Sequence, residues 1–259
     1  MKNFFKQSKN HLRDNRGDGY IWFLSIAVVL LLLFGSLFTV MSTAVNMRDI
    51  RTDVDAAAMD VFADMRTEQY DKLTDGSTSF TDLSQLSNVT VLKKMNSHLG
   101  ATYVNDITPY LTKVDARGHT QYTIENFDFS YVPHVNKKVD GFVRGDLNHD
   151  GECNNVDVSI VEEFVYGSSL SLPSGVYPSM LDFNGDGMPN EKDLAVIKSL
   201  VKYYAAHPIA SSEGAQDKDS ALLVITFDVR VPIRFGTSGF GEKVEECSYY
   251  STFSFIPGI

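Results

Sequence analysis

Two stretches of this sequence repeat one pattern: "DLNHDGECNNVD" at residues 146–157 and "DFNGDGMPNEKD" at residues 182–193. Written as twelve-residue loops, both carry oxygen-bearing side chains at positions 1, 3, 5, 9 and 12, and a glycine at position 6. Alternate residues of such a loop point inward, and the glycine permits the sharp turn between them. The repeat therefore predicts two calcium loops of the EF-hand type.

The candidate ligands are all oxygen donors, with position 7 contributing its backbone carbonyl. They are Asp146, Asn148, Asp150, Glu152, Asn154 and Asp157 in the first loop, and Asp182, Asn184, Asp186, Met188, Asn190 and Asp193 in the second. A flexible, carboxylate-rich oxygen set suits Ca²⁺ better than Mg²⁺. We expect two Ca²⁺ ions, and because the clustered carboxylates repel one another without metal, their binding energy contributes to folding.

One apolar-patterned helix follows each loop, in "DVSIVEEFVYG" at 157–167 and "DLAVIKSLVKYY" at 193–204. No helix is expected before the first loop, and position 12 is Asp in both. This layout, over about residues 143–205, resembles a type I dockerin module. The resemblance implies a cohesin-like partner on a scaffold protein, in a setting of polysaccharide degradation. It also implies partner binding through loop positions 10 and 11, which are Asn155, Val156, Glu191 and Lys192.

The chain begins with a basic segment followed by an uncharged one, from Tyr20 to Met41. A helix over those residues spans a hydrocarbon core of about 30 Å. Lysines and arginines precede it, so the positive-inside rule places residues 1–19 in the cytoplasm and residues 42–259 outside. The alternative is a cleaved secretory signal with its cleavage site at 42–44.

An amphipathic segment continues the apolar one. Its apolar residues recur at helical spacing: Ile50, Val54, Ala58, Val61 and Met65. With no proline before residue 109, one helix is predicted over residues 20–72. A long helix of this kind before a β-rich globule, with the leader "RGDGYIWF", resembles pilin-like proteins, in particular Tad-type pseudopilins. The resemblance implies pilus-type assembly machinery and a leader cut after Gly17 or Gly19; whether it is cut, and whether the subunit polymerises, stays open.

Three segments are rich in β-branched and aromatic residues and are expected to form strands: 120–132, 221–235 and 248–256. They flank the calcium module on both sides, so we expect the module to be inserted into a connection between two strands of the head. The expected fold class is α+β: a long N-terminal helix (20–72), a β-rich head (73–142 and 206–259) and an inserted all-α module (143–205).

Composition excludes some functions. The net charge is −10, with no basic stripe beyond the first sixteen residues, which argues against nucleic-acid binding. No catalytic pattern stands out, so the chain is not expected to be an enzyme; a small dockerin-bearing polysaccharide hydrolase is the less favoured alternative. Cys153 and Cys247 allow one disulfide or none.

The expected function is a bacterial, single-pass, non-enzymatic surface protein that docks a cohesin-type partner through its calcium module, in a cellulosome-like or adhesion assembly. The alternative within the same architecture is a structural pseudopilin, in which calcium only stabilises the head.

Overall fold

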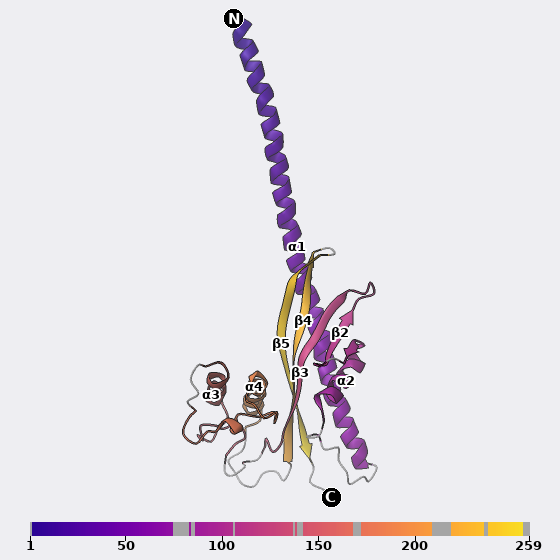
Figure 1. The fold of residues 1–259 in the computed structure, drawn as a ribbon, viewed down its shortest axis with the longest axis vertical. Coiled ribbons are helices and arrows are strands. Elements are labelled where there is room, and N and C mark those ends of the chain that lie inside the picture. The colour runs from indigo at the N-terminus through magenta and orange to yellow at the C-terminus, as the bar shows by residue number, and fades with distance from the viewer. Residues whose placement is uncertain are drawn as a thin grey trace. The chain divides into compact units, whose positions relative to one another are not determined.

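The computed structural model describes residues 2–74, 83, 86–105, 107–136, 138, 142–167, 172–208, 219–235 and 238–255. The helices are α1 (Lys2–Thr74), α2 (Asn88–Leu99), α3 (Asn155–Tyr166) and α4 (Glu191–Ala206), with a short 3₁₀ helix η2 (Pro178–Met180). The strands are β1 (Thr102–Val104), β2 (Tyr110–Val114), β3 (Thr120–Val132), β4 (Asp219–Phe235) and β5 (Ser238–Phe255). The fold is α+β, as predicted (Figure 1).

The chain divides into two compact units. The smaller contains residues 1–50 and 233–241, and the larger contains residues 51–232 and 242–259. In the smaller unit, α1 begins at Lys2 rather than near the predicted Tyr20. No proline interrupts the basic segment, and its two glycines, Gly17 and Gly19, each cost a helix only about 1 kcal/mol. In the part of the chain that the structure describes, the segment Trp22–Asp71 of α1 is, by length and composition only, long and apolar enough to cross a membrane.

In the larger unit, the outer part of α1 buries its apolar stripe. Val54, Ala58 and Val61 are fully buried, as the helical spacing predicted. Polar contacts on the flank of this stripe hold α1 to β5: the Tyr249 hydroxyl donates to the Asp55 carboxylate. Apolar packing against the sheet explains why this half of α1 is amphipathic while the preceding half is apolar on every side.

The sheet has five strands in the order β1-β2-β3-β4-β5. The β1–β2, β2–β3 and β3–β4 pairs are antiparallel. Strand β3 has the predicted bounds, and β4 includes the predicted segment 221–235. Strand β5 contains residues 248–255 of the third predicted segment, and residue 256 lies outside the described residues. β5 begins at Ser238, ten residues before the predicted start at 248, and it continues through a charged stretch that lacks the aromatic pattern.

Helices α3 and α4 lie in the connection between β3 and β4 and share one apolar core with the sheet. Val161 on α3 and Ile197 and Leu200 on α4 belong to the same buried cluster as Val132 of β3 and Leu222 of β4. Helix α4 also touches β5, where the Ser199 and Ser248 hydroxyls are 3.3 Å apart. Helix α4 therefore lies between α3 and the sheet (Figure 1).

Candidate metal centre

The first loop is folded around its opening aspartate. Asp146 is nearly buried, and its carboxylate accepts the backbone N–H groups of Asp150 at 3.1 Å and Gly151 at 2.8 Å. Gly151 has φ 97°, a left-handed conformation that costs a residue with a Cβ about 1–2 kcal/mol. The glycine at position 6 thus turns the chain back over the position-1 carboxylate.

The acid at position 12 closes the same loop. Asp157 is fully buried, and its two oxygens accept the backbone N–H groups of Leu147 at 2.8 Å and Asn154 at 2.9 Å. Asn154 caps α3, with its side chain accepting the Val156 N–H at 2.8 Å. Asn154 and Asp157 form a capping box, because the side chain of each accepts the backbone N–H of the other. The loop and the start of its helix are therefore one hydrogen-bonded unit.

The second loop repeats this arrangement. Asp182 accepts the N–H of Gly187 at 2.9 Å, and Asp193 accepts those of Phe183 at 2.7 Å and Asn190 at 2.8 Å. Asn190 caps α4 within a capping box, as Asn154 caps α3. The same residue types at the same spacing thus give the same local structure twice.

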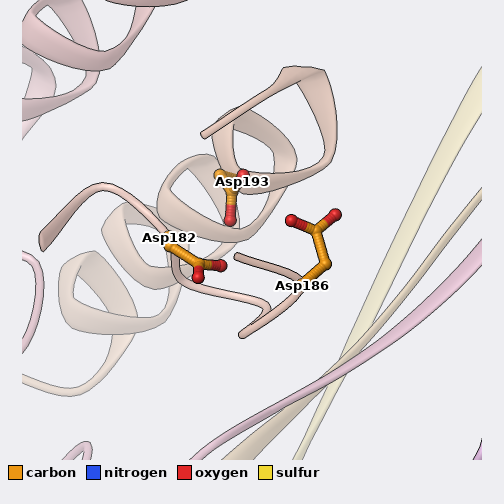
Figure 2. A group of neighbouring side chains, drawn as sticks. All are labelled: Asp182, Asp186 and Asp193. Carbon is orange, nitrogen blue, oxygen red and sulfur yellow. The ribbon is translucent and has the colours of Figure 1, made fainter. Parts of the chain in front are cut away.

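Three carboxylates of the second loop come together. Asp182, Asp186 and Asp193 each offer an oxygen, and these oxygens all lie within 4.8 Å of one another. Figure 2 shows Asp193 on the first turn of α4 and the other two on the loop that leads to it. Among the described residues this is the one such group of acidic, histidine or cysteine side chains. Oxygen donors at this spacing fit a hard divalent cation.

The amide residues fill the gaps between these carboxylates. Asn148 donates to Asp150 at 2.8 Å in the first loop, and Asn190 donates to Asp186 at 2.9 Å in the second. Both position-9 side chains, Asn154 and Asn190, serve as helix caps through their oxygens, so a water is the natural link between them and an ion.

At position 7 of each loop, the side chain is exposed, which fits the expectation that only the backbone carbonyl serves as a ligand. The Met188 side chain is 71% exposed, while its carbonyl accepts the Asn190 amide at 2.8 Å. Glu152 is likewise exposed, and its N–H donates to Asp150 at 3.0 Å.

The pKa values of the loop carboxyls differ according to their surroundings. The Asn148 amide and the Glu152 N–H hold the pKa of Asp150 below its ordinary value. Burial opposes ionisation of Asp186, but hydrogen bonds from Met188 and Asn190 outweigh it and lower its pKa. Burial raises the pKa of Asp193, despite its three N–H donors. A cation bound beside Asp193 would favour its charged form.

The four partner-binding candidates do not share one environment. Asn155 and Val156 are exposed at the start of α3, and Glu191 is exposed at the start of α4. Lys192 is half-buried, with its ammonium 3.5 Å from the carboxylate of Asp128 on β3. Of the two partner-binding candidates at the start of α4, Lys192 therefore already contacts the head.

The cysteines carry no disulfide: Cys153 is a buried free thiol and Cys247 a partly buried one. Burial, followed by the charges of Asp157 and Asp146, raises the pKa of Cys153 to about 12. The residue at position 8 of the first loop is thus a small, neutral core group.

The duplicated loop–helix units define this part of the chain as a paired EF-hand-type module. Residues 144–202 match the family model of the Dockerin type I domain, and that family binds calcium. Neither the curated proteins nor the solved structures gave a match to the chain. The match covers the module and leaves the long helix and the sheet outside it.

Two contacting residues were not among the sequence-based candidates. Asp128 on β3 and Asn88 on α2 meet through a hydrogen bond of 3.0 Å, and Asp128 also reaches the second loop. The sequence signal that could have indicated Asp128 was an acid among aromatic residues in a predicted strand, because a buried carboxylate needs polar partners.

Proposed function

We propose that this chain is a membrane-anchored, pilin-like surface protein whose dockerin module binds two calcium ions and docks a cohesin-type partner. The observation that carries the proposal is the carboxylate group of Asp182, Asp186 and Asp193 within a segment that matches the dockerin family. The proposal includes no catalytic step, and it places the module outside a bacterial cell.

Calcium would be held by the twelve residues predicted from the repeat. In each loop, the side chains at positions 1, 3, 5 and 12 and the carbonyl at position 7 would hold the ion directly, with position 9 acting through water. The ion supplies two positive charges to a loop that holds three carboxylates. This supports calcium-dependent folding of the module, because the carboxylate repulsion is relieved only when the ion is present.

The free face of α3 is the surface we propose for the partner. Val156 is 54% exposed and Tyr166 61% exposed, and Ser159 and Glu163 lie exposed between them on the same stripe. On α4 the corresponding residues are less open: Lys192 and Ala195 are half-buried and Ser199 is buried, while Lys202 is exposed. An exposed aliphatic and an exposed aromatic side chain on one helix face are the kind of residues that anchor interfaces.

The membrane part of the proposal rests on α1. The side chains from Trp22 to Met41 that the structure describes are mostly exposed and apolar, which suits lipid contact better than water. The same helix then becomes amphipathic and packs under a sheet, an arrangement that supports a pilin-like subunit. Handling by pilus-type machinery belongs to this proposal.

The test uses the full chain in detergent micelles and a panel of cohesin modules, measured by biolayer interferometry with calcium or with EGTA. We expect binding in calcium only. Val156→Asp should weaken it at least about tenfold, since it places a charge at one of the two apolar anchors of the proposed surface. The matched control is Tyr177→Asp, at a residue of the module that is 64% exposed and is not part of α3. Equal losses in both variants would refute the α3 face.

A structural role is the second candidate, and one observation favours it. The module and the sheet share a buried core that includes Leu200, Leu222 and Val224, so the packing of the module contributes to the stability of the head. In that role, calcium would raise the thermal stability of the full chain while no cohesin of the panel binds. Calcium-dependent stability together with calcium-dependent binding would favour docking.

A further inference from the structure

One buried carboxylate of the sheet reaches into the second calcium loop. Asp128, on β3, lies outside the dockerin match and is 5% exposed. Its oxygens accept the amide of Asn88 at 3.0 Å and the hydroxyl of Ser130 at 3.0 Å. The Lys192 ammonium lies 3.5 Å away, and the Asn184 amide nitrogen donates at 3.4 Å. Asp128 thus connects α2, β3 and two residues of the second loop.

A β-bulge turns Asp128 toward the module. From Glu125 to Asp128 strand β3 advances three residues, while the paired stretch of β4, from Asp228 to Thr226, advances two. The extra residue, Asn126, has φ 53°, and its amide donates to Asp228 at 2.7 Å. A bulge of this kind re-aims the side chains that follow it.

The effect of the bulge is visible in the side-chain alternation. Tyr122 and Ile124 are buried on one face of β3, and without the extra residue Asp128 would share that face. With the extra residue, Asp128 lies instead on the face of Val132, which packs in the core shared with the module. The strand therefore presents a single carboxylate to the second loop.

The contact falls on a calcium-ligand position. Asn184 stands at position 3, and its amide nitrogen lies between Asp186, at 3.2 Å, and Asp128, at 3.4 Å. Its amide oxygen accepts the Asp186 N–H at 3.0 Å. If the amide group of Asn184 were rotated by half a turn, its oxygen would face the two carboxylates and be repelled by them. The pair of acids therefore fixes which end of Asn184 is available to an ion.

The first loop has no such support. Asn148, at the same position 3, donates to Asp150 at 2.8 Å and accepts its N–H at 2.9 Å. Within the described part of the chain, Asn148 makes no hydrogen bond to the sheet. The two loops, alike in sequence, thus differ in how their position-3 ligand is held.

We propose that Asp128 is a positioning residue for calcium in the second loop, so that the ion and the attachment of the module to the sheet stabilise each other. Asp128 acts by orienting Asn184 and by adding negative charge near the ion. This inference rests on the proposed calcium binding. It gives the position-3 ligand of the second loop a hydrogen bond to the sheet, which the position-3 ligand of the first loop does not make within the described residues.

The test is calcium titration calorimetry on the full chain in detergent micelles. Asp146→Asn with Asp150→Asn disables the first loop and leaves the second to be measured by itself. In that background, Asp128→Asn should raise the Kd about tenfold, the lower end of what loss of a ligand's supporting carboxylate causes. The matched control is Asp115→Asn, the same change in the turn before β3, where the carboxylate accepts the N–H groups of Arg117 and His119, and it should leave the Kd unchanged.

A merely structural role for Asp128 has a different signature. It would lower the melting temperature equally in calcium and in EGTA and leave the Kd unchanged, and that outcome overturns the inference. We expect instead that the calcium-induced rise in melting temperature shrinks in Asp128→Asn. In the opposite background, with Asp182→Asn and Asp186→Asn, the first loop's Kd should not respond to Asp128→Asn.

Should Asp128→Asn fail to fold, Asn88→Ala provides the second variant. Asn88 is uncharged, and among the described residues its side chain hydrogen-bonds to Asp128 and to the Phe129 N–H, not to the loop. A smaller rise in the second loop's Kd therefore supports the inference, and an unchanged Kd overturns it. Absence of calcium binding in every chain would instead defeat the proposed calcium function. If calcium binds and its Kd is the same in both variants as in the parent, only the proposed role of Asp128 would be refuted.

Discussion

The carboxylate of Asp193 accepts the backbone N–H of Phe183 at 2.7 Å, across ten residues of chain. Asp157 makes the same bond to Leu147 at 2.8 Å in the first loop. In each loop, the last candidate ligand therefore ties the start of the loop to the start of the helix. Part of each loop's shape is fixed by the polypeptide itself, before any ion is considered.

Asp193→Asn is expected to destabilise the metal-free protein. The new amide would turn its N–H₂ group toward a backbone N–H that now donates to the carboxylate. The loss of this hydrogen bond should lower the free energy of unfolding by about 2–3 kcal/mol. Scanning calorimetry in EGTA measures this loss. The control is Glu191→Gln, which removes an exposed acid from the same helical turn and should change little. Equal stability of the two variants would contradict this account of position 12.

Gly145→Ala is expected to disturb the entry to the first loop. Gly145 has φ 88°, and an added Cβ would lie 2.8 Å from the Cys153 sulfur and 3.3 Å from Leu200. The strain and the overlap together should cost at least about 2 kcal/mol of unfolding free energy. Thermal unfolding followed by circular dichroism measures the loss.

Two further variants separate strain from overlap at this site. Gly118→Ala, at φ 79° with open space around it, should show the backbone strain alone. Cys153→Ala removes the sulfur, so Gly145→Ala should cost less in that background than in the parent chain. An equal cost in both backgrounds would show that the overlap with Cys153 plays no part.

Alkaline pH is expected to destabilise the head through Cys247. Burial raises the pKa of this thiol to about 11, from an ordinary value near 9. The unfolded chain therefore loses this proton first as the pH rises, and the folded state loses stability from about pH 9 through about pH 11. The melting temperature of Cys247→Ala should fall less than that of the parent over this range. If the melting temperatures of the two proteins fell in parallel with pH, the raised pKa of Cys247 would be contradicted.

The membrane orientation is expected to leave residues 42–259 outside. Protease added to intact bacterial cells should digest an epitope at the C-terminus and spare one placed before residue 17. Mass spectrometry of the N-terminal peptide then tests processing: a cut after Gly17 or Gly19 leaves Asp18 or Tyr20 as the first residue. Release of the whole head into the medium, with a first residue near 45, would support the cleaved secretory signal instead.

The sequence predicted those elements whose signal is local and strong. The two loops and their helices follow from a repeated ligand pattern, and the long helix follows from apolar spacing without proline. Helix α2 was missed, although Ser87 caps it and Val91, Leu92, Met95 and Leu99 are buried along it. Strands β1 and β2, of three and five residues, are too short for alternation to stand out.

The sequence by itself determined the two oxygen-rich loops, the helix after each, and the apolar character of the N-terminal segment, because all of these depend on residues close together in the chain. Only the tertiary structure decided which loop touches the head and which helix face stays open. Asp128 meets Asn184 across 56 residues, through a bulge whose pairing partner lies a hundred residues away. No local pattern encodes a contact of that kind, since it depends on how the module and the sheet pack.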